Sequence, residues 1–280
     1  MRADAITGTA AGVPFTALPP AGTVQDPVPL VVTWHMIDAP RTDAAFAAAL
    51  PMAGVPAWRV HLGMPWCGAR MPEGGRDAII ELARRDAVMA YLNPLIQQAV
   101  TEFPAALAEL RERLPVSNGP LGVLGGSAGG AVALWILAQA TIPVTAAALV
   151  NPAVRARSVV ELIEGIAGQA YPWDERSRVI ADQLDFVARA ADIAARTPQP
   201  PLLVISGELD FPVLRTDAAE LVTALRERYA QPGHVQLTTV PNLPHPLAEQ
   251  PGLEPAPQLP ATKAVDEALT EWFLQHLTTP

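Results

Sequence analysis

Short, uninterrupted runs of apolar and β-branched residues recur along this chain, and most are followed by a segment with helical character. The clearest run is VPLVVTW at 28–34, which lacks polar alternation and therefore suits a strand buried on both faces. Strands of this kind that alternate with helices predict the α/β class, with a mostly parallel central sheet flanked by helices. In such sheets, functional side chains gather in loops at the carboxyl ends of the strands.

The expected elements cover most of the chain. We expect strands at 6–18 (two short ones), 28–34, 58–62, 121–125, 145–150, 202–206 and 235–240, and helices at 42–50, 76–114, 128–140, 159–167, 175–195, 217–229 and 263–277. The long helical segment at 76–114 contains prolines, so we expect a break near Asn93 and Pro94 and a bend or restart at Pro104.

Domain organisation follows from length and from one interruption of the alternation. Half of the 280 residues are hydrophobic, which is enough for the core of one large domain. Residues 153–200 place two helices in succession without a Gly/Ser-rich linker. We therefore expect a single domain over 1–280, with 153–200 inserted in it as a small helical cap.

Charge and cysteine content exclude several function classes. The net charge of −9 and the lack of a basic stripe argue against nucleic-acid binding. Cys67 is the only cysteine, so no intramolecular disulfide can form, and no base is apparent that would activate its thiol. Neither a signal-peptide core nor a run of about 18 apolar residues is present. We expect a cytoplasmic protein without a membrane partner, and whether it forms a homodimer stays open.

The strongest functional signal is Gly-Gly-Ser-Ala-Gly at 125–129, which follows an expected strand and opens an apolar helix. A serine on such a sharp turn holds its hydroxyl out at the end of the sheet. Gly125 and Gly129 lack the Cβ atoms that would clash within the turn. Ser127 is therefore the candidate nucleophile, and the N–H of Ala128 at the helix start is a candidate oxyanion donor. A glycine-rich turn with a capping serine is the simpler alternative, which the two flanking elements disfavour.

A serine hydroxyl needs a base, and the base needs a carboxylate that orients it. His245 follows the strand at 235–240 and lies on the same side of the expected sheet as Ser127. The strand at 202–206 leads into Glu208 and Asp210. We select Asp210 as the acid because it is farther from the strand and can turn toward His245, and we keep Glu208 as the reserve.

With these three residues in this order, the sequence resembles the α/β-hydrolase superfamily over nearly its whole length. The segment at 125–130 is similar to the nucleophile elbow of serine esterases and prolyl-oligopeptidase-type hydrolases, and Gly207-x-x-Asp210 to the family's acid loop. The resemblance implies an α/β-hydrolase fold with a helical cap over 153–200. It also implies a Ser-His-Asp triad formed by Ser127, His245 and Asp210.

One loop departs from the family pattern. The family often has His-Gly after its third strand, where a following N–H completes the oxyanion hole. His35 stands at this point, but Met36 replaces the glycine, so the second donor is expected to be Met36 or Ile37. His35 would then contact substrate or mainly support the loop.

Apolar and aromatic side chains near strand ends or in the expected cap indicate an apolar substrate pocket, although each could equally belong to the core. Besides His35, the expected substrate-contacting residues are Met64, Trp66, Tyr171, Trp173 and Phe211. No His/Asp/Glu grouping has metal-ligand spacing, so we expect neither a metal nor another cofactor.

The sequence thus predicts a serine hydrolase that cleaves a small to medium carboxylic ester through an acyl-enzyme intermediate. A thioesterase, a peptidase or an amidase of the same fold is the nearest alternative. A non-catalytic binding protein with this fold is an alternative of a different class, which the unusual loop at His35 and Met36 favours.

Overall fold

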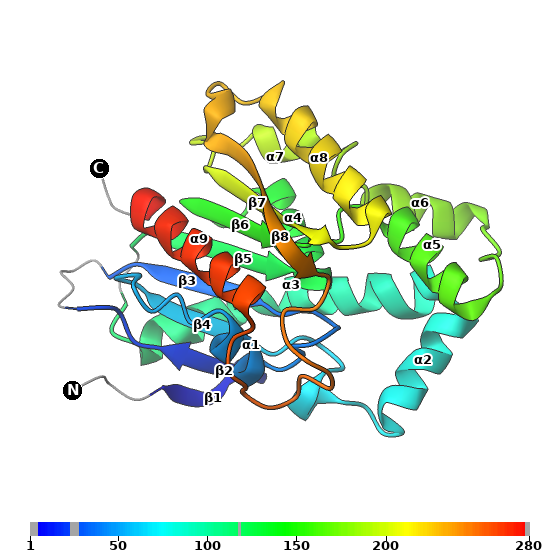
Figure 1. Ribbon diagram of the computed structural model, residues 1–280, viewed down its shortest axis with the longest axis horizontal. Helices are drawn as coiled ribbons and strands as arrows, with labels where there is room; N and C mark the ends of the chain where they lie inside the picture. Colours follow the sequence, from blue (N-terminus) through cyan, green and yellow to red (C-terminus); the bar gives the residue numbers. More distant parts are fainter. Residues whose placement is uncertain (1–4, 23–27, 117–118, 278–280) are drawn as a thin grey trace.

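A central sheet organises the computed structural model, which describes residues 5–22, 28–116 and 119–277. Residues 1–4, which belong to the segment in which we expect no signal-peptide core, lie outside the described residues. The strands are β1 (Ile6–Ala10), β2 (Val13–Leu18), β3 (Leu30–Trp34), β4 (Trp58–Leu62), β5 (Leu121–Gly126), β6 (Ala146–Val150), β7 (Leu202–Leu209) and β8 (Val235–Pro244). They lie in the order β1-β2-β4-β3-β5-β6-β7-β8 (Figure 1).

The sheet is mostly parallel, as the sequence predicts. β2 pairs antiparallel with both β1 and β4, and the pairs from β4 through β3 to β8 are parallel. Every residue of β3, β4, β5 and β6 is buried, because helices cover both faces of these central strands. Their carboxyl ends therefore meet at one edge.

Two groups of helices form the outer layers. α1 (Asp43–Ala49) and α9 (Pro260–His276) cover one face, where Phe46 and Trp272 enter a core with the inner residues of β5 and β6. α3 (Asn93–Arg113), α4 (Ala128–Gln139) and α8 (Pro212–Arg226) cover the other face. There Trp34 of β3 meets Phe103 of α3 edge to face, with ring centroids 4.8 Å apart.

Three further helices lie past the carboxyl ends of the strands. α2 (Gly75–Arg85), α5 (Ala156–Ala167) and α6 (Glu175–Gln183) stand together at that end of the molecule (Figure 1). α7 (Ala190–Ala194) instead packs on α4 through Ala190 and Ile193, which are fully buried. The segment 153–200 is thus divided between the two locations.

Two predicted helices are interrupted where an aspartate side chain accepts hydrogen bonds from the backbone N–H groups two and three residues further along. The break expected at Asn93 occurs at Asp86, whose backbone is extended. The Asp86 side chain accepts from the N–H groups of Val88 and Met89, and a π-helical turn, Ala87–Leu92, begins there. This turn continues directly into α3. The predicted helix 175–195 ends at Gln183, because Asp185 binds the N–H groups of Val187 and Ala188 in the same way.

Two features around prolines also bear on the prediction. Of the bend or restart expected at Pro104, the restart does not occur, since the buried face of α3, which includes Phe103 and Leu107, holds the helix against the core. α8 begins at Pro212, five residues before the predicted start at 217, because a proline in the first turn needs no N–H partner and has a suitable φ.

Both strands that precede the candidate acid and base are longer than predicted. β7 continues to Leu209 and β8 to Pro244, so Asp210 and His245 each follow their strand directly. The two strands remain paired up to Leu209 and Pro244, across an irregularity between Gly207 and Leu209. No helix in the described residues combines the length and apolar character that crossing a membrane requires.

Candidate active site

Ser127 occupies a strained turn between β5 and α4. Its φ is 48° and its ψ is −117°, a backbone conformation that residues other than glycine rarely adopt. A Cβ on Gly125 would lie 2.1 Å from the carbonyl oxygen of Gly129, and one on Gly129 would lie 2.2 Å from that of Trp34. Glycine is therefore required at both positions, as the sequence predicts for a turn that directs a serine outward.

A continuous hydrogen-bonded chain joins the three residues that the sequence selects. His245 Nε2 lies 2.9 Å from Ser127 Oγ, and His245 Nδ1 lies 2.7 Å from Asp210 Oδ1. Asp210 Oδ1 also accepts from the N–H of Phe211 at 2.7 Å. Asp210 and His245 are buried, whereas Ser127 is partly exposed. This geometry lets the imidazole accept the serine proton while the carboxylate orients it.

The reserve acid, Glu208, is placed differently. Its side chain is exposed and accepts from the N–H of Asn242 at 3.0 Å, within the β7–β8 pair. The structure therefore brings Asp210, and not Glu208, to the imidazole of His245.

Asn151, which the sequence analysis treats only as the end of a strand, connects the acid and base segments. It is fully buried after β6, with a φ of 44° that asparagine tolerates better than most residues. Its Nδ2 donates to the carbonyls of Pro244 and His245 at 2.9 and 3.1 Å, and its Oδ1 accepts from the N–H of Gly207 at 2.7 Å. Asn151 thereby holds the end of β7 beside the His245 segment.

The loop after β3 lies against the nucleophile turn. Met36 is fully buried, and its Cγ lies 3.0 Å from the position of a Cβ on Gly126, the residue before Ser127. The backbone of Met36 and Ile37 is thus a neighbour of the turn, together with Ala128 at the start of α4, whose N–H has no partner within that helix.

His35 ties this loop to the loop after β4. Its Nδ1 donates to the carbonyl of Met36 at 2.6 Å, and its Nε2 accepts from the N–H of Met64 at 2.9 Å. The pKa of His35 is lowered to about 4, mainly by burial, with the bond to Met36 opposing the shift and the Arg70 charge adding to it. The neutral ring therefore serves as a fixed brace of the loop.

The other residues that the sequence assigns to substrate occupy varied environments. Phe211 is 42% exposed and lies beside His245, with ring centroids 5.3 Å apart. Trp66 is half-buried next to Tyr91. Met64, in contrast, has no exposed surface and belongs to the core.

Tyr171 and Trp173 lie in the segment between α5 and α6. Their rings meet edge to face at 4.8 Å, the Tyr171 hydroxyl donates to Asp86, and Arg157 stacks over Trp173 at 4.8 Å. The bond to Asp86 joins the segment to the residues that precede α3, and the stacking of Arg157 joins it to α5.

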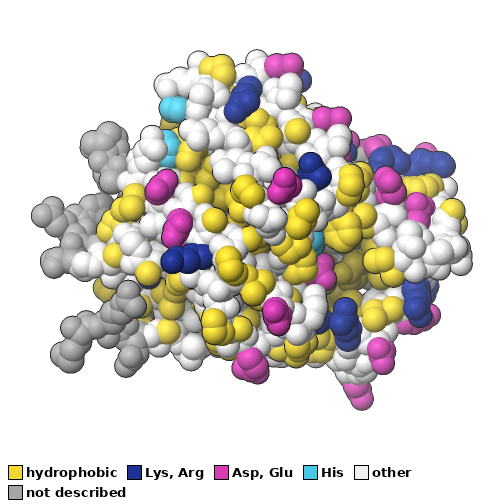
Figure 2. Space-filling view, in the orientation of Figure 1, with side chains coloured by type: hydrophobic (Ala, Val, Ile, Leu, Met, Phe, Trp, Pro, Cys, Tyr) yellow, Lys and Arg dark blue, Asp and Glu magenta, His cyan; other side chains and the backbone are white. Residues whose placement is uncertain are grey.

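Asp38 is a further residue of the site that the sequence analysis does not single out. Its Oδ2 lies 3.9 Å from His245 Nε2, and its side chain is 47% exposed. In the space-filling view, a small histidine surface with acidic atoms beside it borders a hollow near the carboxyl ends of the strands (Figure 2).

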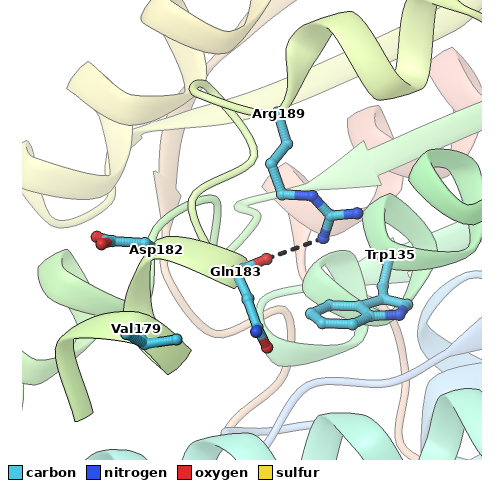
Figure 3. Close-up of a pocket in the computed structure, with 5 residues that line it drawn as sticks. All are labelled: Trp135, Val179, Asp182, Gln183 and Arg189. Atoms are coloured by element: carbon cyan, nitrogen blue, oxygen red, sulfur yellow. Dashed lines mark hydrogen bonds between the residues drawn. The ribbon is translucent and has the colours of Figure 1, made fainter. Parts of the chain in front are cut away.

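A broad depression of about 660 Å³ lies apart from these residues, over α4 and α6 (Figure 3). Arg189 lines the depression, donates to the carbonyl of Gln183 at 2.9 Å and stacks over the Trp135 ring at 4.9 Å. Asp182, which also lines the depression, pairs with Arg157, and none of the lining residues belongs to the hydrogen-bonded chain of Ser127, His245 and Asp210. Among the described residues, no three His, Cys, Asp or Glu side chains gather in a way that could hold a metal ion.

Solved structures resemble the whole chain. TT1662 from Thermus thermophilus is 20% identical with a TM-score of 0.64, and the match covers 98% of this chain and 99% of that protein. An acylaminoacyl peptidase from Pyrococcus horikoshii is 12% identical with a TM-score of 0.66. The match covers 99% of this chain but only 42% of the peptidase, so this chain spans less than half of its length.

An esterase also has this fold. Carboxyl esterase 2 from Tuber melanosporum is 16% identical with a TM-score of 0.55, over 98% of this chain and 86% of the esterase. At these identities the likeness establishes the fold, which is that of the α/β-hydrolases. The sequence matches no curated protein.

The family comparison concerns the part of the chain that carries the site. The model of the prolyl oligopeptidase family matches residues 92–278, two thirds of the chain, and this range includes Ser127, Asp210 and His245. The chain belongs to the prolyl oligopeptidase family and is a serine hydrolase of the α/β-hydrolase superfamily.

Proposed function

We propose that Ser127, His245 and Asp210 form a catalytic triad that cleaves a small to medium carboxylic ester through an acyl-enzyme intermediate. The observation that carries this proposal is the hydrogen-bonded chain from Asp210 through His245 to Ser127 at the start of α4. A serine in this position has both a base and a nearby helix N-terminus, which favours the negative charge of a tetrahedral intermediate.

The reaction proceeds in two steps. Ser127 Oγ attacks the carbonyl carbon while His245 Nε2 takes its proton, and the N–H groups of Ala128 and of Met36 or Ile37 stabilise the oxyanion. His245 then gives the proton to the leaving alcohol, and the acyl group stays on Ser127. Water, deprotonated by His245, releases the acid in the second step.

The surroundings support an ester with an apolar part. Phe211 and Leu209 are 42% and 61% exposed where β7 ends at the acid segment, and Phe211 lies beside His245. We place the apolar part of the substrate against this surface, and we propose that α5 and α6, within the segment 153–200, act as a cap over it.

Peptide cleavage is the second candidate, because the chain belongs to the prolyl oligopeptidase family and has the fold of an acylaminoacyl peptidase. The same triad would cleave an amide, with His245 protonating the leaving amine.

A matched pair of substrates tests the proposal. A p-nitrophenyl ester and a p-nitroanilide with the same acyl group are compared by kcat/KM, with Ser127→Ala as the control. We expect the ester to be hydrolysed with an initial burst of one nitrophenol per active site, and Ser127→Ala to lose at least about 10³-fold. Because the activated ester is intrinsically the more reactive of the two, anilide cleavage at a kcat/KM comparable to that of the ester would put the peptidase first, and equal activity in Ser127→Ala would refute both.

A further inference from the structure

A second carboxylate, that of Asp38, stands beside the reacting atoms. Asp210 binds the Nδ1 side of His245, whereas Asp38 Oδ2 lies 3.9 Å from Nε2, the atom that also faces Ser127 Oγ at 2.9 Å. The side chain of Asp38 is 47% exposed and follows β3 at the same edge of the sheet. A bound substrate must therefore pass close to this negative charge.

Two arginines in the neighbouring loops, Arg41 and Arg70, have partners of their own. Arg41 donates to the carbonyl of Pro251 and to the side chain of Gln250, and Arg70 pairs with Glu102. Among the described residues, the ion pairs include none between Asp38 and a lysine or arginine. Within residues 5–22, 28–116 and 119–277, the Asp38 carboxylate thus forms no ion pair with a lysine or arginine that would offset its charge.

On the basis of the proposed function, we propose that Asp38 is a specificity-determining residue that selects substrates carrying an organic ammonium group close to the scissile carbonyl. The leaving atom must come within about 3 Å of His245 Nε2 to receive its proton. Since Asp38 Oδ2 lies 3.9 Å from the same nitrogen, it is at most about 7 Å from that atom. An ammonium two to four bonds from the scissile bond reaches Asp38 from either side.

The neighbouring side chains favour an organic cation. Phe211 presents an exposed ring beside His245, and aromatic faces attract alkylammonium groups. A single carboxylate does not supply the several oxygen ligands that a bound Ca²⁺ or Mg²⁺ requires. An anionic substrate would meet repulsion from Asp38 at the same place.

Two pairs of esters with nearly equal shape separate charge from size. Alanine methyl ester and methyl isobutyrate differ by an ammonium on the acyl side, and acetylcholine and 3,3-dimethylbutyl acetate differ by one on the leaving-group side. The alanine ester is assayed below the pKa of about 8 of an α-amino group, so that it is charged. The pair that shows the preference identifies the side on which the ammonium binds.

The variants are Asp38→Asn, Asp38→Glu and a matched control, Glu227→Gln. Glu227 lies where α8 ends, and α8 begins beside Asp210 and runs for 15 residues away from the site. We expect the wild type to prefer the cationic ester of at least one pair, and Asp38→Asn to reduce that preference about tenfold. Asp38→Glu and Glu227→Gln keep the preference, and added salt weakens it in the wild type.

Two outcomes would overturn the inference about Asp38 and leave the proposed ester hydrolysis standing. One is hydrolysis of neutral and cationic esters at equal kcat/KM by the wild type. The other is an equal loss for both members of a pair in folded Asp38→Asn with a shifted pH profile, which would make Asp38 a positioning residue for His245. If no ester of either pair is hydrolysed and Ser127 does not react with a fluorophosphonate, the proposed function itself fails, and the inference fails with it.

Discussion

Removing the Asn151 side chain tests how the candidate acid and base are held together. Asn151→Ala deletes three hydrogen bonds: a partly buried one donated to the carbonyl of Pro244, a buried one donated to that of His245, and a buried one accepted from the N–H of Gly207. These bonds join the end of β7 to the His245 segment. We expect the variant to lose both stability and activity.

The size of the loss follows from the contacts. Each buried polar group left without a partner costs about 1–3 kcal/mol, and an alanine at a φ of 44° adds about 1–2 kcal/mol. Because water can enter and replace part of the bonding, we expect about 3–5 kcal/mol less free energy of unfolding. For a domain of this size, this lowers Tm by roughly 6–15 °C. Displacing the imidazole by about 1 Å would lower kcat about 10²-fold.

Asn151→Gly is the matched control, because it loses the same three hydrogen bonds without the backbone strain. We expect its Tm to lie between those of Asn151→Ala and the wild type, with a similar loss of kcat. Thermal unfolding followed by circular dichroism and steady-state ester hydrolysis measure both quantities. An Asn151→Ala protein with wild-type Tm and kcat would refute the idea that this residue holds the two segments together.

Three further changes test other parts of the account. Asp210→Asn should keep Tm but lower kcat by about 10³–10⁴-fold, since His245 loses its fixed tautomer; a kcat within tenfold of wild type would argue against this role. Gly125→Ala should fail to fold stably, because its Cβ would meet the Gly129 carbonyl oxygen at 2.1 Å, and wild-type stability would contradict the turn geometry. Burial, with a smaller effect of the Arg59 charge, lowers the pKa of His61 in the folded protein to about 3. In the unfolded chain the histidine pKa is near 6.5, so between pH 6.5 and pH 3 only the unfolded chain gains a proton. The contribution of His61 to the free energy of unfolding is therefore complete above about pH 6.5 and falls by about 2 kcal/mol between pH 7.5 and pH 5. Urea unfolding at several pH values measures this loss, and we expect His61→Asn to show a weaker pH dependence than the wild type.

Features with a local cause could be predicted from the sequence. The turn at Ser127 depends on glycines at 125 and 129, which lie within two residues of it, and the alternation of apolar runs and helices indicates the parallel sheet. The order of acid and base after later strands then selects Asp210 and His245, and the structure brings both to Ser127.

Features that depend on contacts between distant segments could not be predicted in this way. The side chain of Asn151 binds Gly207 and His245, which are 56 and 94 residues away, and a strand-ending Asn-Pro carries no sign of these partners. The approach of Asp38 to His245 likewise joins residues that are far apart in the sequence, and no local pattern indicates it. Hydrophobicity also cannot separate a pocket residue from a core residue, so Met64, which is fully buried, carries the same pattern as the exposed Phe211.

The most direct test of the account is whether Ser127 is an activated nucleophile. The purified protein is treated with a fluorophosphonate probe beside Ser127→Ala and His245→Ala, and labelling is determined by intact mass. The account predicts one adduct on the wild type and none on either folded variant. A correctly folded wild-type protein that takes up no probe would contradict it.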